Sequence, residues 1–210
     1  MRRGLKKNPA PTMKVLGITG GIGMGKSAVS TLLEKRNVSV VDTDHLARKV
    51  VEPGQPALEE VQALFGTGVI GADGRLQRQE LARRVFGSAV SRKQLEAILH
   101  PRIRALWLKQ IEEWREAGEG AGAIVIPLLF ETKAQKHFDA VVCIASSAET
   151  QKKRLLERKM TEEQINQRIK AQLPIAKKME LADYVIWNEG TLEETGLQLN
   201  EVLMSVGVLE

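Results

Sequence analysis

The sequence predicts an α/β protein with a mostly parallel, five-stranded sheet, and two observations carry this prediction. Short apolar runs, read as strands, cover residues 14–19, 38–41, 123–126, 141–145 and 184–187. Helical patterns separate them, and strands that alternate with helices are typical of a parallel sheet flanked by helices. The third and fourth runs contain no charged residue, as expected of central strands that are buried on both faces.

The N-terminal half begins with a strand, a glycine-rich turn and a helix over 26–33. After the second strand, a helix over 45–51 is expected to end at Pro53-Gly54, a turn signal. Residues 55–117 show helical patterns around a turn at Ala72-Asp73-Gly74. This stretch is too long for a simple crossover, so an inserted helical subdomain that covers a ligand is expected.

Several helix boundaries can be predicted between residues 91 and 204. Ser91 and Gln94 fit a capping box, and His100-Pro101 suggests a helix break before a long amphipathic helix. Trp107 and Trp114 lie on the apolar face of that helix, which favours packing over substrate stacking. A charged helical segment over 148–173 is expected to break near Met160-Thr161, with a capping box from Thr161 to Gln164, and to stop at Pro174. A closing helix is predicted over 191–204.

Composition excludes several classes of protein. The chain has 210 residues, is 43% hydrophobic, and lacks an apolar run long enough to span a membrane. The single Cys143 excludes an internal disulfide and a multi-cysteine zinc site, which is typical of a cytoplasmic protein. Its eight aromatic residues offer few stacking surfaces for single-stranded nucleic acid.

The net charge of +5 lies mostly in residues 1–12, which contain four basic residues and no acidic one. We expect these residues to be a disordered basic extension, and they do not fit a secretory signal. The rest of the chain is close to neutral, which suits a compact polyphosphate ligand better than a long nucleic acid.

A phosphate-binding motif follows the first strand. Residues 20–27, GGIGMGKS, fit the pattern G-x-x-x-x-G-K-[ST] between a strand and a helix, the context that the motif requires. Glycines allow backbone N–H groups to cradle phosphate oxygens at the positive end of the helix. Lys26 is predicted to reach the β and γ phosphates, and the Ser27 hydroxyl to ligate Mg²⁺. No Asn-Lys-x-Asp motif is present, which disfavours GTP.

Two carboxylates, Asp42 and Asp44, end the second strand. Ligands of open α/β sheets bind at this edge, and a kinase needs a carboxylate to align or deprotonate its acceptor hydroxyl. Asp44 has an alternative role as the N-cap of the following helix, and Asp42 as a solvated turn residue. Beside a phosphate-binding loop, the catalytic interpretation of Asp44 is favoured. Arg48 lies one helical turn later and is expected to face the same cleft.

The chain resembles the dephospho-coenzyme A kinases over residues 13–200. The motifs that carry the resemblance are, in chain order, TGGIGMGKS at 19–27, VDTD at 41–44, VEPG at 51–54, DGRL at 73–76, His100-Pro101, PLLFE at 127–131, QKKR at 151–154, Gln172, ADYVI at 182–186 and NEG at 188–190. The resemblance implies a P-loop NTPase fold, similar to the nucleoside monophosphate kinases, with a helical substrate-binding subdomain and a lid. It also implies transfer of phosphate from Mg·ATP to the ribose 3′-hydroxyl of dephospho-coenzyme A, the final step of coenzyme A biosynthesis.

On this resemblance, the kinase domain covers 13–210. It divides into a core of residues 13–44, 118–147 and 180–210, a substrate subdomain of about 45–117 and a lid of about 148–179. The residues expected to bind ATP are Gly21, Ile22, Gly23, Met24, Gly25, Lys26, Ser27, Ala28, Arg154 and Asn188, the last through the adenine. The residues expected to bind the acceptor are Asp44, Arg48, His100 and Glu131. Asp44, Lys26 and Arg154 are expected to be catalytic.

The alternatives are open at this point. Arg154 and Arg158 also fit a solvated charged face, and His100 a structural position before a proline. Met24 and Ala28 depart from the family's usual Ser and Thr, and the loss of a hydroxyl at Ala28 is expected to weaken ATP binding modestly. A kinase for another acceptor such as a nucleoside monophosphate, a nucleic-acid-binding protein and an inactive scaffold are the competing functions. The partners expected are small molecules, with no nucleic acid or membrane, and the protein is expected to be a monomer or small homo-oligomer.

Overall fold

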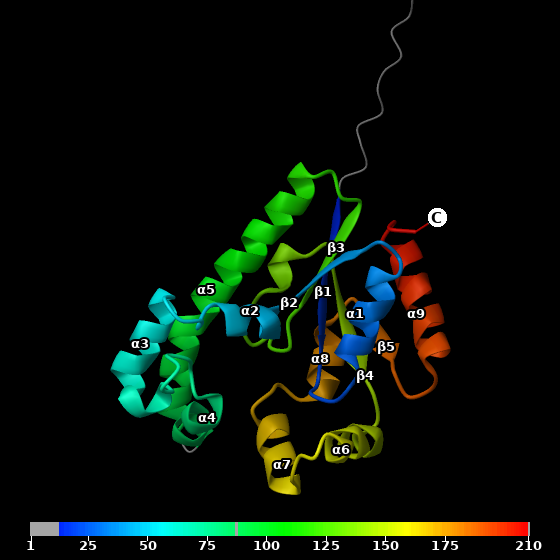
Figure 1. The fold of residues 1–210 in the computed structure, drawn as a ribbon. Coiled ribbons are helices and arrows are strands. Elements are labelled where there is room, and N and C mark those ends of the chain that lie inside the picture. The colour runs from blue at the N-terminus through cyan, green and yellow to red at the C-terminus, as the bar shows by residue number, and fades with distance from the viewer. Residues whose placement is uncertain (1–12, 87, 210) are drawn as a thin grey trace, which may run out of the picture. The chain divides into compact units, whose positions relative to one another are not determined.

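The fold is built on a five-stranded parallel sheet (Figure 1). The structure is a computed structural model that describes residues 13–86 and 88–209. The strands lie in the order β2-β3-β1-β4-β5. Their bounds are Lys14–Gly20 for β1, Ser39–Asp42 for β2, Ala121–Val125 for β3, Ala140–Ala145 for β4 and Tyr184–Trp187 for β5. β1 pairs in parallel with β3 and β4, and β4 with β5, so the carboxyl ends of these strands meet at one edge. The expected extension, residues 1–12, lies outside the described residues.

The chain divides into two compact units, which are described separately. Among the described residues, the first contains 13–40 and 113–209, and the second contains 41–86 and 88–112. The first unit holds β1, β3, β4 and β5 together with the helices α1, α6, α7, α8 and α9. These helices span Lys26–Glu34, Ala148–Glu157, Glu162–Lys170, Ile175–Leu181 and Leu192–Ser205, and a short 3₁₀ helix, η2, spans Gln135–His137.

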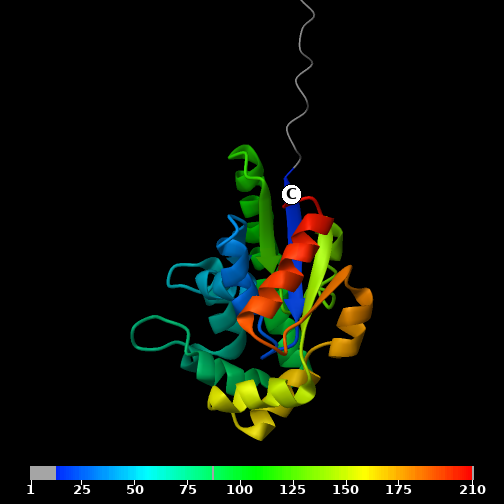
Figure 2. The ribbon, with the colours of Figure 1, turned by 90° about the vertical axis from the view of Figure 1, so that its right-hand side faces the viewer.

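One face of the sheet packs against α1 and α9, which contact each other. Alternate strand residues such as Leu16, Ile18 and Val142 form a buried cluster with Leu33 of α1 and Leu203 of α9. Figure 2 shows α9, in red, running along the strands. The predicted closing helix is therefore confirmed, and it begins with a capping box between Thr191 and Glu194.

Bulky side chains cover the opposite face. A Cβ at Gly17 would lie 2.6 Å from Phe138, and one at Gly122 would lie 2.5 Å from Trp114. These glycines therefore allow aromatic rings to pack directly on the strands. Helix α8 contacts β1 and β4, and Cys143 of β4 is fully buried in the core.

The second unit is helical. It contains α2 (Thr43–Lys49), α3 (Pro56–Phe65), the 3₁₀ helix η1 (Thr67–Val69), α4 (Arg78–Phe86) and most of α5 (Ala89–Glu116). Val50, Val51 and Leu58 form one apolar cluster, and Val61, Val69 and Leu81 form another. The predicted turn at residues 72–74 is present, where Ile70 and Leu76 form an isolated antiparallel bridge. Apart from Val41 and Asp42, which end β2, the described residues of this unit contribute no strand to the central sheet.

The predicted helix break at His100-Pro101 is wrong. Helix α5 continues from Ala89 to Glu116 with Pro101 inside it. Pro101 removes the N–H that would donate to the carbonyl oxygen of Ala97. The Arg102 guanidinium donates to the neighbouring carbonyl oxygen of Ile98 at 2.7 Å. The predicted capping box at Ser91 is also wrong, because Ser91 lies inside α5 and its N–H donates to the hydroxyl of Ser88.

Two further boundaries differ from expectation. α2 begins at Thr43, two residues early, because the Asp42 carboxylate accepts from the N–H of Asp44 at 2.8 Å. Asp42 is therefore the N-cap, and Asp44 lies within the first turn. The charged helical segment ends at Lys170, before Pro174 as predicted, but a further helix, α8, follows Pro174 and was not predicted. The capping box of Thr161 with Gln164 is confirmed.

Candidate active site

The glycine-rich loop joins β1 to α1 and leaves the start of α1 uncapped. Gly25, at φ +98°, is the N-cap residue, and no side chain caps the helix there. Because no side chain caps α1, the positive end of the helix faces the loop, where an anionic ligand would be stabilised. Ser27, the residue predicted to ligate Mg²⁺, is exposed on the first turn of α1.

Lys26 folds back over the loop that it follows. Its Nζ donates to the carbonyl oxygens of Gly20 and Gly21, each at 2.9 Å. This position keeps the ammonium above the turn where phosphate would lie. The Met24 side chain, 1% exposed, packs beneath, and its sulfur would lie 2.8 Å from a Cβ at Gly21. Met24 thus contributes packing as well as backbone.

Asn188, which follows β5, supports the same loop from the core. Its Nδ2 donates to the carbonyl oxygen of Met24 at 3.0 Å, and its Oδ1 accepts from the Thr195 hydroxyl at 2.9 Å. The side chain is 6% exposed. The residue therefore lies at the predicted nucleotide loop, although its contacts within the protein are to the loop backbone and α9. Its contact with adenine stays a prediction.

Two glutamines from the predicted lid hold the backbone of Ile22. Gln151 of α6 donates from Nε2 to the carbonyl oxygen of Ile22 at 2.7 Å. Gln172, after α7, accepts from the N–H of Ile22 at 3.1 Å. Both polar groups of one loop residue are thereby fixed by side chains 129 and 150 residues away. Sequence reasoning assigned neither glutamine a role.

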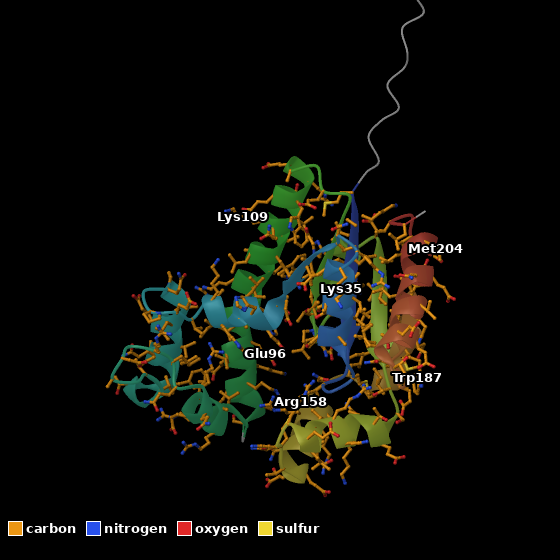
Figure 3. All side chains as sticks on the ribbon, turned by 45° about the vertical axis from the view of Figure 1, so that its right-hand side comes forward. Lys35, Glu96, Lys109, Arg158, Trp187 and Met204 are labelled. Atoms are coloured by element: carbon orange, nitrogen blue, oxygen red, sulfur yellow. The ribbon has the colours of Figure 1, made fainter. Side chains whose placement is uncertain are left out.

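Arg154 also reaches the loop from α6. Its Nη1 is buried without a hydrogen-bond partner among the described residues, and it would lie 3.7 Å from a Cβ at Gly25. A buried guanidinium nitrogen without a partner is costly, and a phosphate oxygen would satisfy it. Arg158, labelled in Figure 3, is exposed at the end of α6. The structure thus brings Arg154, rather than Arg158, to the loop.

Glu131 and Lys178 form an unexpected ion pair near the carboxyl end of β3. Lys178 is fully buried, and its Nζ lies 2.9 Å from Glu131 Oε1 and donates to the carbonyl oxygen of Pro127 at 2.5 Å. The same Oε1 accepts from the N–H of Leu173 at 2.7 Å. Glu131 therefore anchors the chain after α7. Lys178 was missed because nothing in its helix segment, IAKKMEL, distinguishes it from the exposed Lys177.

The ionisation of two groups follows from these surroundings. Burial raises the pKa of the Cys143 thiol to about 11, although Lys178 and Lys26 oppose the shift. The thiol is thus protonated at neutral pH and is not a nucleophile. Hydrogen bonds lower the pKa of Glu189 to about 2, first from the Ser147 hydroxyl, then from the Ser147 N–H and the Thr150 hydroxyl. No role was predicted for Glu189 from the sequence. In the structure, its carboxylate accepts hydrogen bonds from Ser147, the N-cap residue of α6.

The remaining predicted residues belong to the second unit. Asp44 and Arg48 are both exposed and lie four residues apart on α2, so they share a face of the helix. His100 lies in α5, where burial lowers its pKa, so its imidazole is neutral at pH 7. Within the described ranges, no cluster of three or more His, Cys, Asp or Glu side chains is placed to hold a metal ion. None of the described helices is long and apolar enough to cross a membrane.

Comparison with known proteins decides the family. Residues 14–194 match the family model for dephospho-CoA kinase. The dephospho-CoA kinase of Shouchella clausii is 43% identical over 189 residues, which cover 90% of this chain and 96% of the relative. The chain belongs to the dephospho-CoA kinase family.

Solved structures agree with this family membership. A protein from Thermus thermophilus superposes with a TM-score of 0.79 at 34% identity, covering 92% of this chain and 97% of the other. The dephospho-CoA kinase of Campylobacter jejuni gives a TM-score of 0.68 at 25% identity, covering 91% and 96%. The P-loop kinase fold predicted from the sequence is therefore confirmed, and the dephospho-CoA kinase family is one of ATP-using phosphotransferases.

Proposed function

We propose that this protein transfers the γ-phosphoryl group of ATP to the ribose 3′-hydroxyl of dephospho-coenzyme A. The products are coenzyme A and ADP, and the reaction is the final step of coenzyme A biosynthesis. The observation that carries the proposal is the buried Arg154 Nη1, which has no partner among the described residues and lies beside Gly25 of the phosphate loop. Family membership supplies the acceptor.

The loop and the lid helix bind ATP in this proposal. The loop of residues 21–28 surrounds the phosphates, and Lys26 leaves its two carbonyl acceptors to contact the β and γ phosphates. Arg154 satisfies its Nη1 on a phosphate oxygen and stabilises the negative charge that remains on the transferred group. Asn188 lies next to the loop, at the position proposed for the adenine.

A magnesium ion held with the phosphates would neutralise part of their negative charge. Ser27 is the residue proposed to hold it, because its hydroxyl is exposed on the first turn of α1. The hard cation prefers such oxygen ligands together with phosphates and water.

Asp44 is the group proposed to align the ribose 3′-hydroxyl and to accept its proton. A carboxylate suits this role because it is ionised at neutral pH and can accept a hydrogen bond from the hydroxyl. Arg48, on the same face of α2, and the neutral His100 are proposed to contact the acceptor. Glu131 is proposed to contact it through Oε2, because its bonds to Leu173 and Lys178 both use Oε1.

The deciding experiment is a coupled ADP-release assay of the purified protein with ATP, Mg²⁺ and dephospho-coenzyme A. We expect ADP formation that depends on the acceptor, and a product heavier by one phosphate in mass spectrometry. Nucleoside monophosphates form the comparison panel. ADP formation with one of these but not with dephospho-coenzyme A would identify a kinase of another specificity.

The surroundings in which the enzyme works are also part of the proposal. Its partners are the two small-molecule substrates, without nucleic acid, and it acts in the cytoplasm as a monomer or small homo-oligomer. The near-neutral charge of residues 13–210 supports the choice of small ligands over nucleic acid.

A further inference from the structure

A strongly basic cavity lies within the second unit. Its volume is about 500 Å³, and it opens between α2, the residues that follow α2, and the turn before α4. The charged and imidazole side chains that line it are His45, Arg48, Lys49, Glu52, Arg75 and Arg78. Four permanent cations therefore surround this space with a single carboxylate, an arrangement that attracts an anion.

The arginines that line the cavity have few acidic partners, in contrast to other arginines of this unit. Among the described residues, the side chains of Arg48 and Arg78 form no hydrogen bond or ion pair. Arg75 lies 3.8 Å from Asp73, and both side chains are more than half exposed, so this pair contributes little.

By contrast, arginines elsewhere in the unit pair with glutamates. Arg83 and Arg84 both contact Glu80, and Arg102 contacts Glu60 at 2.6 Å. The positive charges that line the cavity are thus largely without acidic partners, whereas arginines outside the cavity have them. Such a cluster loses its mutual repulsion when a multivalent anion binds.

The position of Asp44 connects the cavity with the acceptor. Asp44 and Arg48 lie on one face of α2, separated along the helix axis by about 6 Å. In dephospho-coenzyme A, the 3′-hydroxyl and the 5′-diphosphate are substituents of the same ribose ring. An acceptor that places its 3′-hydroxyl at Asp44 can therefore extend its diphosphate along α2 toward Arg48.

We infer that this cavity binds the 5′-diphosphate of the acceptor, with Arg48 and Arg78 as its principal ligands and Lys49, Arg75 and His45 around them. The inference rests on the proposed function, because that function supplies the diphosphate. Guanidinium groups hold phosphate oxygens through paired hydrogen bonds, so the cavity selects an acceptor that carries a diphosphate over a bare nucleoside.

Calorimetric titration tests the inference, with the loop first saturated by a non-hydrolysable ATP analogue so that ligands report on the acceptor site. The variants are Arg48→Ala and Arg78→Ala, and the matched control is Arg83→Ala, an exposed arginine of the same unit outside the cavity. Each cavity variant should weaken dephospho-coenzyme A binding about tenfold or more, since each removes a charge-assisted contact. Arg83→Ala should bind it as the wild type does. Thermal melting checks that all three are folded.

Adenosine, which has the 3′-hydroxyl but no diphosphate, separates the possible outcomes. Its affinity should be the same in Arg48→Ala, Arg78→Ala and the wild type. Equal weakening for adenosine and dephospho-coenzyme A would overturn the inference, as would unchanged dephospho-coenzyme A binding in both variants. If the wild type neither binds nor phosphorylates dephospho-coenzyme A, the proposed function itself fails, and this result is distinguishable because it precedes any comparison of variants.

Discussion

The amide of Asn188 lies directly against the α-carbon of Gly25, so close that a Cβ there would be 1.7 Å from Nδ2. Gly25 also has a φ of +98°, which side chains other than glycine rarely adopt. Two independent restrictions therefore act on this residue, one from the backbone and one from the buried amide. The same amide bonds the Met24 carbonyl, so the shape of the loop and the packing of the core are linked at this contact.

We predict that Gly25→Ala strongly weakens nucleotide binding. The backbone conformation alone costs about 1–3 kcal/mol, and the added methyl group displaces Asn188 from the loop. ATP affinity, measured by titration with a fluorescent analogue, should fall by about 100-fold or more. Gly118→Ala is the matched control, because its φ of +73° imposes strain but no atom lies within 4 Å of the new Cβ. ATP affinity near the wild-type value in Gly25→Ala would contradict this account.

We predict that Gln151→Leu and Gln172→Leu each raise the KM for ATP by about 3- to 10-fold, because each frees one polar group of Ile22. The loop would then have to be ordered by the nucleotide itself. Gln167→Leu, on the exposed side of α7 where it bonds Glu163, is the control and should leave this KM unchanged. Steady-state kinetics at saturating acceptor measure the effect, and equal KM values in all three variants would disprove it.

We predict that Asp44→Asn lowers turnover by about 10²- to 10⁴-fold while ATP affinity is retained, since the amide cannot accept the proton. Asp42→Asn is the control from the same turn, because an asparagine oxygen can still cap α2. Single-turnover measurements separate chemistry from product release. Comparable loss of turnover in both variants would show that the turn, rather than the Asp44 carboxylate, is required.

The Glu131–Lys178 pair should be asymmetric in its effect on stability. We predict that Glu131→Ala lowers the free energy of unfolding by about 3 kcal/mol, because it leaves the fully buried Lys178 without its anion. Lys178→Met should cost less, since Glu131 keeps 23% of its side chain exposed and can turn to water. The double variant should be more stable than the sum of the single effects implies.

Chemical denaturation measures these differences. Lys177→Met, which removes an exposed pair with Glu180, should change stability by less than about 0.5 kcal/mol. Additive effects of Glu131→Ala and Lys178→Met would show that the two side chains do not act as a pair.

Glu189 should contribute a pH-dependent part of stability. Its pKa is lowered from 4.5 to about 2 in the folded protein, so folding favours the carboxylate. The stabilisation is complete above about pH 4.5 and is lost as the pH falls toward 2. The stability difference between the wild type and Glu189→Gln should therefore shrink over this range in denaturation curves. Ser147→Ala, which removes the largest cause of the shift, should reduce the pH dependence, and a difference constant with pH would refute the assignment.

The parallel sheet and the phosphate loop could be predicted because their signals are local. Apolar runs define the strands, and the motif at residues 20–27 specifies its own turn and helix start. The capping box at Thr161 is equally local, since both partners lie within one helical turn. In each case, neighbouring residues determine the structure.

The supports of the loop could not be predicted in the same way. Asn188, Gln151 and Gln172 reach the loop from more than 100 residues away, and no local pattern indicates which polar residue turns inward. Pro101 shows that a local signal can also mislead. Proline predicted a helix break, but α5 continues through this residue. Lys178 could not be predicted either. Lysines are ordinarily exposed, whereas Lys178 is fully buried.

The segment that carries Arg154 is fastened at both of its ends. Glu189 holds Ser147 at its start, and Glu131 holds Leu173 at its end. Hydrogen bonds at both ends limit how far this segment can move as a whole. The guanidinium of Arg154 is therefore held near Gly25 by contacts that lie far from it in the sequence.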